Sequence, residues 1–216
     1  MSYLPCLEYV KLPDNIAGFP DSSVFALFSS TEAELKIEIP ASATTLGRAF
    51  ENSWNLTEIV LNEGLKTIGY NCFYKCKKLK SIEIPSTVTS ITGCAFEYCT
   101  SLKSIKIPEN ANLTDSYILA YNTGLESAEI YSTSIPNCTL YGCTALKSVV
   151  IGEKVSRIEG WNFYDTNNLT SVEFKNPKGW SVSGVGAISE ADLKDPASAA
   201  AKVKQYYYQT WTRSDS

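Results

Sequence analysis

The chain has 216 residues and a formal net charge of −4, and 44% of its residues are hydrophobic while 19% are charged. Lys and Arg are scattered along it, so it lacks the basic cluster that nucleic acids and anionic lipids require. It contains no histidine, which excludes Ser-His and Cys-His catalysis and histidine-ligated metals. No apolar run approaches the length of a membrane-spanning helix. We therefore expect no nucleic-acid partner, no transmembrane segment, no catalytic or metal site and no cofactor.

One phrase recurs along the chain. A leucine followed by alternating apolar residues returns every 21–23 residues, as in LKSIEIP from Leu79 and LKSIKIP from Leu102. A fixed period with apolar positions in phase indicates a solenoid, in which each unit buries its apolar face only against its neighbours. The anchors of the eight predicted rungs are Leu7, Leu35, Leu56, Leu79, Leu102, Leu125, Leu146 and Leu169.

These rungs predict the fold of residues 1–175. We expect a β-rich right-handed solenoid with one parallel sheet of about eight short strands, its first two rungs irregular. A second apolar element follows each strand, as at Val88 and Ile91, and an aromatic residue or leucine lies six positions before each anchor from Leu56 onward. In the unit that begins at Leu102, Thr114 is expected at the isoleucine position and Asn122 at a position where other rungs have cysteine.

Three pairs of closely spaced cysteines, CFYKC, CAFEYC and CTLYGC, raise the question of a metal or redox site. Counting back three residues from each anchor instead gives one column, in which a small side chain can donate to a neighbouring backbone carbonyl group. We favour structural packing over zinc, which needs convergent thiolates. A disulfide between Cys76 and Cys99 on adjacent rungs stays open. The predicted structural ladder is Cys76, Cys99, Asn122 and Cys143, in line with Ser53 and Thr166.

Two sets of outward side chains are candidates for binding a partner. The first consists of strand residues four positions after an anchor, which point away from the core because strand side chains alternate. The second consists of tyrosines at the rung corners, a residue type favoured in protein contacts. Simpler roles are cross-strand charge pairing for the first set and shielding of the core edge for the second. The candidate partner-binding face is Glu83, Lys106, Glu129, Glu173, Tyr74, Tyr98, Tyr121, Tyr141 and Tyr164.

Residues 176–216 are predicted to form a capping segment, because a solenoid must cover its terminal rung. A turn at Asn176 and Pro177 precedes a returning strand at about 180–183. A helix is expected at about 195–211, with Asp195 as N-cap and Pro196 at its first position. The chain begins inside a repeat, at Leu4 to Leu7, so we expect either a longer natural protein or an exposed strand edge there.

The stretch IPSTVTSITGCAFEYCTSLKSIKIP, from Ile84 to Pro108, resembles the repeat of the BspA-like leucine-rich repeat family of bacterial cell-surface proteins. The resemblance covers about residues 35–175. It implies a non-enzymatic cell-surface or secreted protein, its signal or lipoprotein segment removed. The implied role is adhesion to a protein or glycan partner, such as host extracellular matrix or another microbial surface. An intracellular, cytoplasmic protein-interaction scaffold is the alternative.

Overall fold

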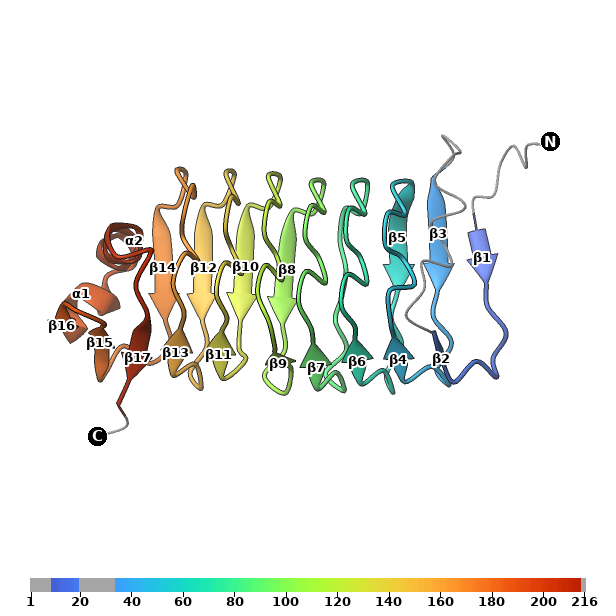
Figure 1. The fold of residues 1–216 in the computed structure, drawn as a ribbon, viewed down its shortest axis with the longest axis horizontal. Coiled ribbons are helices and arrows are strands. Elements are labelled where there is room, and N and C mark those ends of the chain that lie inside the picture. The colour runs from blue at the N-terminus through green and yellow to red at the C-terminus, as the bar shows by residue number, and fades with distance from the viewer. Residues whose placement is uncertain (1–8, 20–33, 215–216) are drawn as a thin grey trace.

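The computed structural model describes residues 9–19 and 34–214, which form an elongated parallel β-solenoid (Figure 1). Each described turn of the chain but one contributes a strand to one face, and each contributes a shorter strand to the next face. The predicted repeat solenoid is therefore confirmed. The expectation for Leu4 to Leu7 lies outside the described residues.

The strands that begin at or near the leucine anchors lie side by side in parallel. They form a sheet in the order β1-β3-β5 and a second in the order β14-β12-β10-β8. Their registers keep equivalent repeat positions opposite one another; Ser104, Ser127, Ser148 and Ser171, for example, form one row. The strands are β1 (Tyr9–Lys11), β3 (Leu35–Glu38), β5 (Leu56–Val60), β8 (Ser104–Ile107), β10 (Ser127–Ile130), β12 (Ser148–Ile151) and β14 (Ser171–Phe174).

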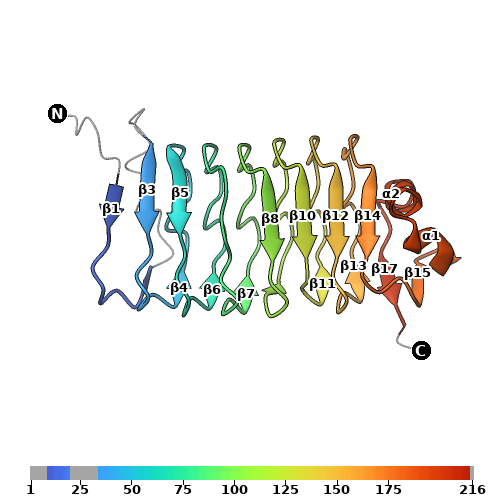
Figure 2. The same ribbon diagram turned by 180° about the vertical axis from the view of Figure 1, so that it is seen from behind.

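This face is two sheets rather than the one continuous sheet that the repeat predicted. The rung from Leu79 to Pro85 lies between β5 and β8 but forms no strand, as Figure 2 shows. Only long backbone bonds flank it, from Lys80 N to the Thr57 carbonyl at 3.4 Å and from Lys103 N to the Lys80 carbonyl at 3.3 Å. The register shift recorded on this face lies earlier, between β3 and β5, where Thr57 is an extra residue relative to the shorter rung of β3. The rung from Leu79 has the same spacing of apolar residues as the rungs on either side of it, so its sequence does not explain the interruption.

The short strands after each turn form the second face. β2 (Gly18–Phe19), β4 (Thr45–Leu46), β6 (Thr67–Ile68), β7 (Ser90–Ile91) and β9 (Asn112–Leu113) pair in parallel, as do β11 (Ser134–Ile135) and β13 (Arg157–Ile158). The expectation that Thr114 takes the isoleucine position is wrong, because Ile91 pairs with Leu113, which is buried. The turn after Pro108 is one residue shorter than the turn after Pro85, which moves the register.

Columns of identical or similar side chains fill the space between the faces. The rings of Phe50, Phe73 and Phe96 stack at centroid distances of 5.3 and 5.2 Å, with interplanar angles of 6° and 10°. All three are fully buried. The column continues with Leu119, Leu140 and Phe163, so each rung fills the same position with a large apolar side chain.

The C-terminal segment covers the last rung. It comprises β15 (Trp180–Val182), β16 (Gly186–Ala187), α1 (Glu190–Lys194), α2 (Pro196–Gln205) and β17 (Trp211–Arg213). The N-cap is the expected one, since Asp195 Oδ1 accepts from Ser198 N at 2.7 Å. Helix α2 packs against β14 and buries Ala199, Ala200 and Val203.

The predicted end of this helix at residue 211 is wrong. The helix ends at Gln205, and Trp211 lies in β17, which pairs antiparallel with β13 and β15. This strand supplies hydrogen bonds to β13, and it buries the Trp211 ring 6.3 Å from Phe174. Pairing of the open strand edge and burial of the apolar end of the core stabilise the protein more than further helical turns would.

Candidate functional site

The cysteine column lies inside the solenoid. Cys76, Cys99 and Cys143 donate their thiol hydrogens to the carbonyl oxygens of Phe50, Phe73 and Leu119, at 3.2, 3.1 and 3.3 Å. The three are free thiols and fully buried, and desolvation raises the pKa of Cys143 to about 12. Protonated, buried thiols are poor nucleophiles and poor metal ligands. The column thus joins one rung to the next.

Asn122 occupies the same column without making the same bond. Its side chain is fully buried, and neither Oδ1 nor Nδ2 has a hydrogen-bond partner. An unsatisfied buried amide lowers stability. Asn122 is therefore accommodated in the column but does not form the side-chain hydrogen bond to the neighbouring rung that Cys76, Cys99 and Cys143 form.

The first candidate set, on the strand face, is already largely paired. Lys106 Nζ lies 3.9 Å from Glu129 Oε2, and Glu173 lies 2.6 Å from the Lys175 ammonium nitrogen. Glu83 forms no ion pair among the residues that the structure describes, so the expected cross-strand charge pairing is seen only between Lys106 and Glu129. The structure brings Glu83, Lys106 and Glu129 to a shallow groove of about 460 Å³ beside the interrupted rung, and Glu173 lies apart from it.

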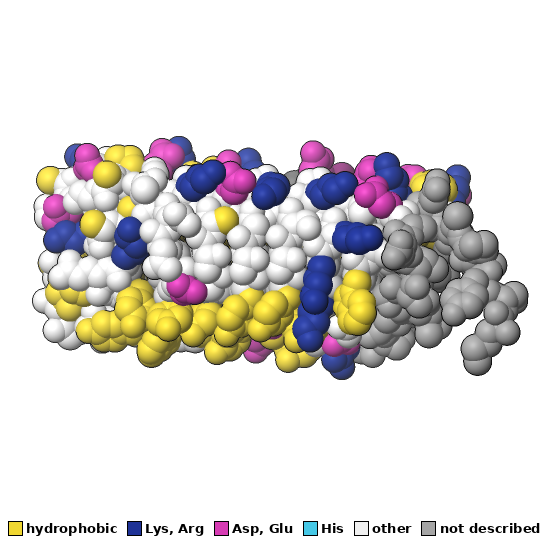
Figure 3. Space-filling model, turned by 90° about the horizontal axis from the view of Figure 1, so that it is seen from above, with side chains coloured by type: hydrophobic (Ala, Val, Ile, Leu, Met, Phe, Trp, Pro, Cys, Tyr) yellow, Lys and Arg dark blue, Asp and Glu magenta, His cyan; other side chains and the backbone are white. Residues whose placement is uncertain are grey.

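The second candidate set forms a continuous row of touching rings. Ring centroids are 5.9 Å apart for Tyr74 and Tyr98, 4.7 Å for Tyr98 and Tyr121, 5.3 Å for Tyr121 and Tyr141, and 4.7 Å for Tyr141 and Tyr164. Figure 3 shows the corresponding band of hydrophobic side chains along one edge of the molecule. The five tyrosines predicted from the rung corners therefore share one surface.

The row extends beyond the repeats into the C-terminal segment. Tyr207, which follows α2, lies 5.5 Å from Tyr164 and 5.4 Å from Trp161. Tyr117 lies beside Tyr141 at 6.3 Å. We call the aromatic strip the set Tyr74, Tyr98, Tyr117, Tyr121, Tyr141, Trp161, Tyr164 and Tyr207.

Three members of the strip, Tyr117, Trp161 and Tyr207, are not in the candidate set predicted from the sequence. Tyr117 lies eight positions before its anchor, in the same repeat column as Trp161, so this signal was available. Tyr207 belongs to the run Tyr206–Tyr208, and only the end of α2 decides which of the three rings faces the strip.

Several rings of the strip occupy backbone positions that suit other residues better. Tyr98 and Tyr121 have φ of +61° and +57°, in a column that holds Asn52, Lys75, Gly142 and Asp165 in other rungs, all at positive φ. Tyr117 and Trp161 have φ of +62° and +64°. Left-handed backbone costs a bulky L residue about 1–2 kcal/mol, while Gly, Asn and Asp tolerate it. Backbone geometry thus does not account for aromatic residues at these four positions.

Charges lie beside the strip as well. Lys75 Nζ is 4.9 Å from the centre of the Tyr74 ring and 5.9 Å from that of Tyr98. Burial and then the nearby Glu97 carboxylate raise the pKa of Tyr98. Desolvation, the neighbouring tyrosines and, more weakly, Asp165 raise the pKa of Tyr141. The phenols of Tyr98 and Tyr141 therefore remain protonated at neutral pH.

Within residues 9–19 and 34–214, no group of three or more His, Cys, Asp or Glu side chains is arranged to hold a metal ion. In the same ranges, no helix has the length and apolarity needed to cross a bilayer.

Comparison with known proteins identifies the repeat. Six copies of the BspA type leucine-rich repeat region match residues 22–134 and 121–183. The chain belongs to the BspA-type leucine-rich repeat family. BspA-type leucine-rich repeat proteins generally serve in protein interaction or are associated with the cell surface, and are generally non-enzymatic.

Solved structures of bacterial leucine-rich repeat proteins have the same fold. A leucine-rich repeat protein from Bacteroides ovatus is 26% identical with a TM-score of 0.69, over 77% of this chain and 45% of that protein. This BspA-type chain thus spans less than half the length of that relative. The T. pallidum leucine-rich repeat protein is 21% identical with a TM-score of 0.66, over 74% of this chain and 77% of that one. No curated protein matches the sequence.

Proposed function

We propose that this BspA-type protein is a non-enzymatic cell-surface or secreted binding protein that holds a protein partner on its aromatic strip. The observation that carries the proposal is the unbroken row of rings from Tyr74 to Tyr207, which crosses from the repeats into the C-terminal segment. Tyrosine and tryptophan on a rigid scaffold supply large contact area at a low cost in conformational entropy.

The backbone supports a role beyond shielding the core. Shielding can be provided by any apolar side chain, yet Tyr98, Tyr121 and Trp161 stand at positive φ, in columns where other rungs have Asn, Asp, Gly, Lys or Cys. Strained positions cluster where structure serves function. The strand face supports a binding role less well, because Lys106, Glu129 and Glu173 are already in ion pairs.

Ring geometry favours a protein over a glycan. A sugar stacks on a free ring face of about its own size, but Tyr98 stacks on Tyr121 with an interplanar angle of 5°, and Tyr141 on Tyr164 with 20°. These stacked faces are occupied by each other. The exposed edges and hydroxyl groups suit the mixed polar and apolar contacts of a protein interface.

The test is capture by immobilised protein of purified extracellular-matrix proteins and, separately, of a glycan array. We expect a matrix protein to bind and glycans not to bind. A Tyr141→Ser, Tyr164→Ser variant should bind at least tenfold more weakly, whereas Glu83→Gln, on the strand face, should bind as wild type does. Failure to bind any matrix protein, or unchanged binding by the tyrosine variant, would overturn the proposal. Protease accessibility on intact source cells tests the surface location, and protection there would favour the intracellular scaffold.

A further inference from the structure

The aromatic strip contains two kinds of tyrosine contact, and the repeat column decides which kind forms. Tyr98 and Tyr121 both lie four positions before an anchor, and their rings stack at 4.7 Å with an interplanar angle of 5°. Tyr141 and Tyr164 both lie five positions before an anchor, and their rings stack at 4.7 Å with an angle of 20°. Rings from different columns are tilted, by 86° for Tyr74 with Tyr98 and by 65° for Tyr121 with Tyr141. The two stacked pairs are therefore pairs of equivalent residues on neighbouring rungs.

Equivalent residues bring equivalent atoms together. Side chains of one column leave the backbone in the same direction, because the rungs repeat. Tyr98 and Tyr121 also share the left-handed backbone conformation, with φ of +61° and +57°. The carbons next to the phenol oxygen, Cε of each ring, therefore approach each other across a stacked pair, with the offset usual for stacked rings. In a tilted pair, by contrast, the edge of one ring meets the face of the other.

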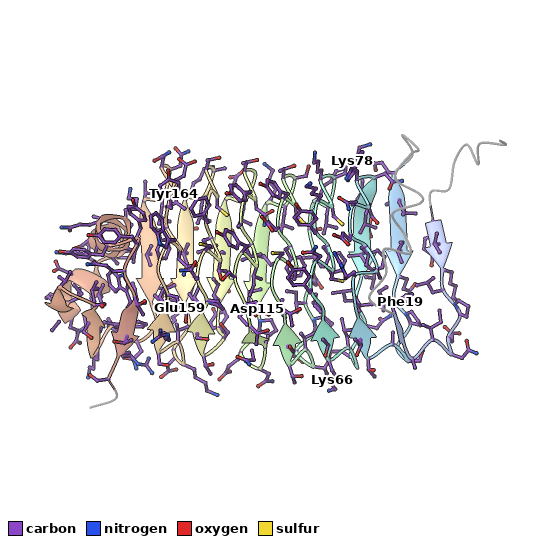
Figure 4. All side chains as sticks on the ribbon, viewed as in Figure 1. Phe19, Lys66, Lys78, Asp115, Glu159 and Tyr164 are labelled. Carbon is purple, nitrogen blue, oxygen red and sulfur yellow. The ribbon has the colours of Figure 1, made fainter. Side chains whose placement is uncertain are left out.

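Backbone hydrogen bonds between rungs hold each stacked pair together. Tyr98 N donates to the carbonyl oxygen of Ala120, next to Tyr121, at 3.0 Å, and Gly142 N donates to the carbonyl oxygen of Tyr164 at 2.9 Å. Figure 4 labels Tyr164, which lies at the end of the row where the C-terminal segment begins to cover the rod. Two groups held side by side in this way react as if at a very high local concentration.

The four phenols of the stacked pairs are open to a reagent in solvent. Tyr98, Tyr121 and Tyr141 are partly exposed, and Tyr164 is 38% exposed. The inner phenylalanine column has the same stacked geometry but is fully buried and carries no phenol. The stacked tyrosines thus combine close ring contact, an oxidisable phenol and access from solvent.

We propose that the two stacked pairs, Tyr98 with Tyr121 and Tyr141 with Tyr164, are sites of oxidative coupling to dityrosine. Each coupling joins two neighbouring rungs by a covalent bond. The oxidant is hydrogen peroxide, used by a haem peroxidase that removes single electrons from phenols. The inference goes beyond the binding role of the aromatic strip and does not depend on it.

The coupling removes two hydrogen atoms from each pair. The peroxidase takes one electron and one proton from each of the two phenols, which leaves two phenoxyl radicals. Their unpaired electrons form a carbon–carbon bond between the two Cε atoms. The hydrogen on each of these carbons then moves, as a proton, to the oxygen of its own ring, and both phenols are restored. The two electrons and two protons that have left reduce one hydrogen peroxide to two molecules of water.

A coupled pair would stabilise the repeats. The new bond closes a loop of the chain between residues 98 and 121, or between residues 141 and 164, and a closed loop lowers the conformational entropy of the unfolded chain. The urea midpoint of unfolding should therefore rise by about 0.5 M or more after oxidation.

The experiment oxidises the full chain with hydrogen peroxide and a haem peroxidase, at two protein concentrations. Accessible thiols are alkylated first, because thiols reduce phenoxyl radicals and Cys94 is partly exposed. Dityrosine is detected by its blue fluorescence, and the mass of the intact chain shows whether it has lost pairs of hydrogen atoms without forming dimers. We expect an intramolecular product whose yield per chain is the same at both concentrations.

Tryptic peptides identify the coupled residues. Coupling of the first stacked pair joins peptides 81–103 and 107–147, and coupling of the second joins 107–147 and 158–175. The tilted pair Tyr74 and Tyr98 would instead join 67–75 and 81–103. We expect each stacked-pair product to be at least about fivefold more abundant than this tilted-pair product, because only the stacked rings present their Cε atoms to each other.

Variants that keep the ring but remove the phenol test the assignment. Tyr121→Phe should abolish the link between 81–103 and 107–147 and leave the second link intact, and Tyr164→Phe should do the reverse. Tyr208→Phe is the control: this tyrosine is 53% exposed and lies outside the strip, so both links should persist. A first link that survives in Tyr121→Phe would place the coupling on another tyrosine and would contradict the assignment.

Three results would overturn the proposal. They are dityrosine that forms mainly between molecules, a tilted-pair product as abundant as the stacked-pair products, and no dityrosine under conditions that couple N-acetyltyrosine. None of them bears on the binding role, which is judged by capture of a matrix protein on the unoxidised chain. Loss of that capture, in turn, leaves the coupling of the stacked pairs untouched.

Discussion

Two aromatic columns run along the solenoid, one inside it and one on its surface. Inside, Phe50, Phe73 and Phe96 stack at 5.3 and 5.2 Å, and the column then accepts leucine in two rungs. On the surface, the tyrosines keep a ring in every rung from Tyr74 to Tyr164 and accept positive φ at two of these positions. The inner column thus depends on packed volume, whereas the outer one maintains an unbroken aromatic surface that core packing does not require.

The largest expected effect is on the inner column. Phe73→Ala should lower the free energy of unfolding by about 3–5 kcal/mol, because it leaves a cavity between two stacked rings. Phe73→Leu should cost well under half of that, since the column already holds Leu119 and Leu140. Urea unfolding measures both. Equal losses for the two variants would show that the inner column needs rings and not volume.

A smaller effect, of opposite sign, is expected at Asn122. Asn122→Cys should raise the free energy of unfolding by about 1–2 kcal/mol, because it removes two unsatisfied polar atoms and restores the thiol-to-carbonyl bond made at Cys99 and Cys143. Asn122→Ala is the control, since it removes the amide without adding the bond. A cysteine variant less stable than wild type would contradict this account of the column.

The smallest effect on stability is expected on the outer column. Tyr121→Asn should change the free energy of unfolding by less than about 1 kcal/mol, because relief of the left-handed backbone offsets the lost ring contacts. The same variant should lose affinity for the partner. A loss of stability as large as that of Phe73→Ala would mean that the outer rings support the core, and the contrast between the columns would disappear.

The fold could be predicted from the sequence because the apolar residues of the repeat recur at a fixed spacing. Each anchor leucine from Leu35 onward is fully buried, and the same spacing assigned Cys76 and Cys99 to a packing column in place of a metal site. The interruption at Leu79–Pro85 was not visible, because LKSIEIP has the same apolar pattern as LTEIVL and LKSIKIP on either side of it. The helix end at Gln205 depends on pairing between Trp211 and a strand over fifty residues earlier.

The candidate surface could be predicted only in part. The tyrosines at the rung corners are spread over two repeat columns, with Tyr74, Tyr141 and Tyr164 five positions before an anchor and Tyr98 and Tyr121 four. Spacing alone therefore does not show that they touch. Side-chain directions at positive φ bring the two columns into one row, and the fold of the C-terminal segment adds Tyr207.

The unpaired rung from Leu79 to Pro85 also sets how the rod can bend. On the strand face, sheet pairing joins β1 to β5 and β8 to β14, but this rung is joined to its neighbours by two long backbone hydrogen bonds through Lys80, of 3.4 and 3.3 Å. On the second face, the parallel strands from β2 to β9 continue past it without a break, through β6 and β7. A load that opens the strand face therefore acts at this rung, where the second face is continuous, whereas a load in the opposite direction meets the break in the second face between β9 and β11.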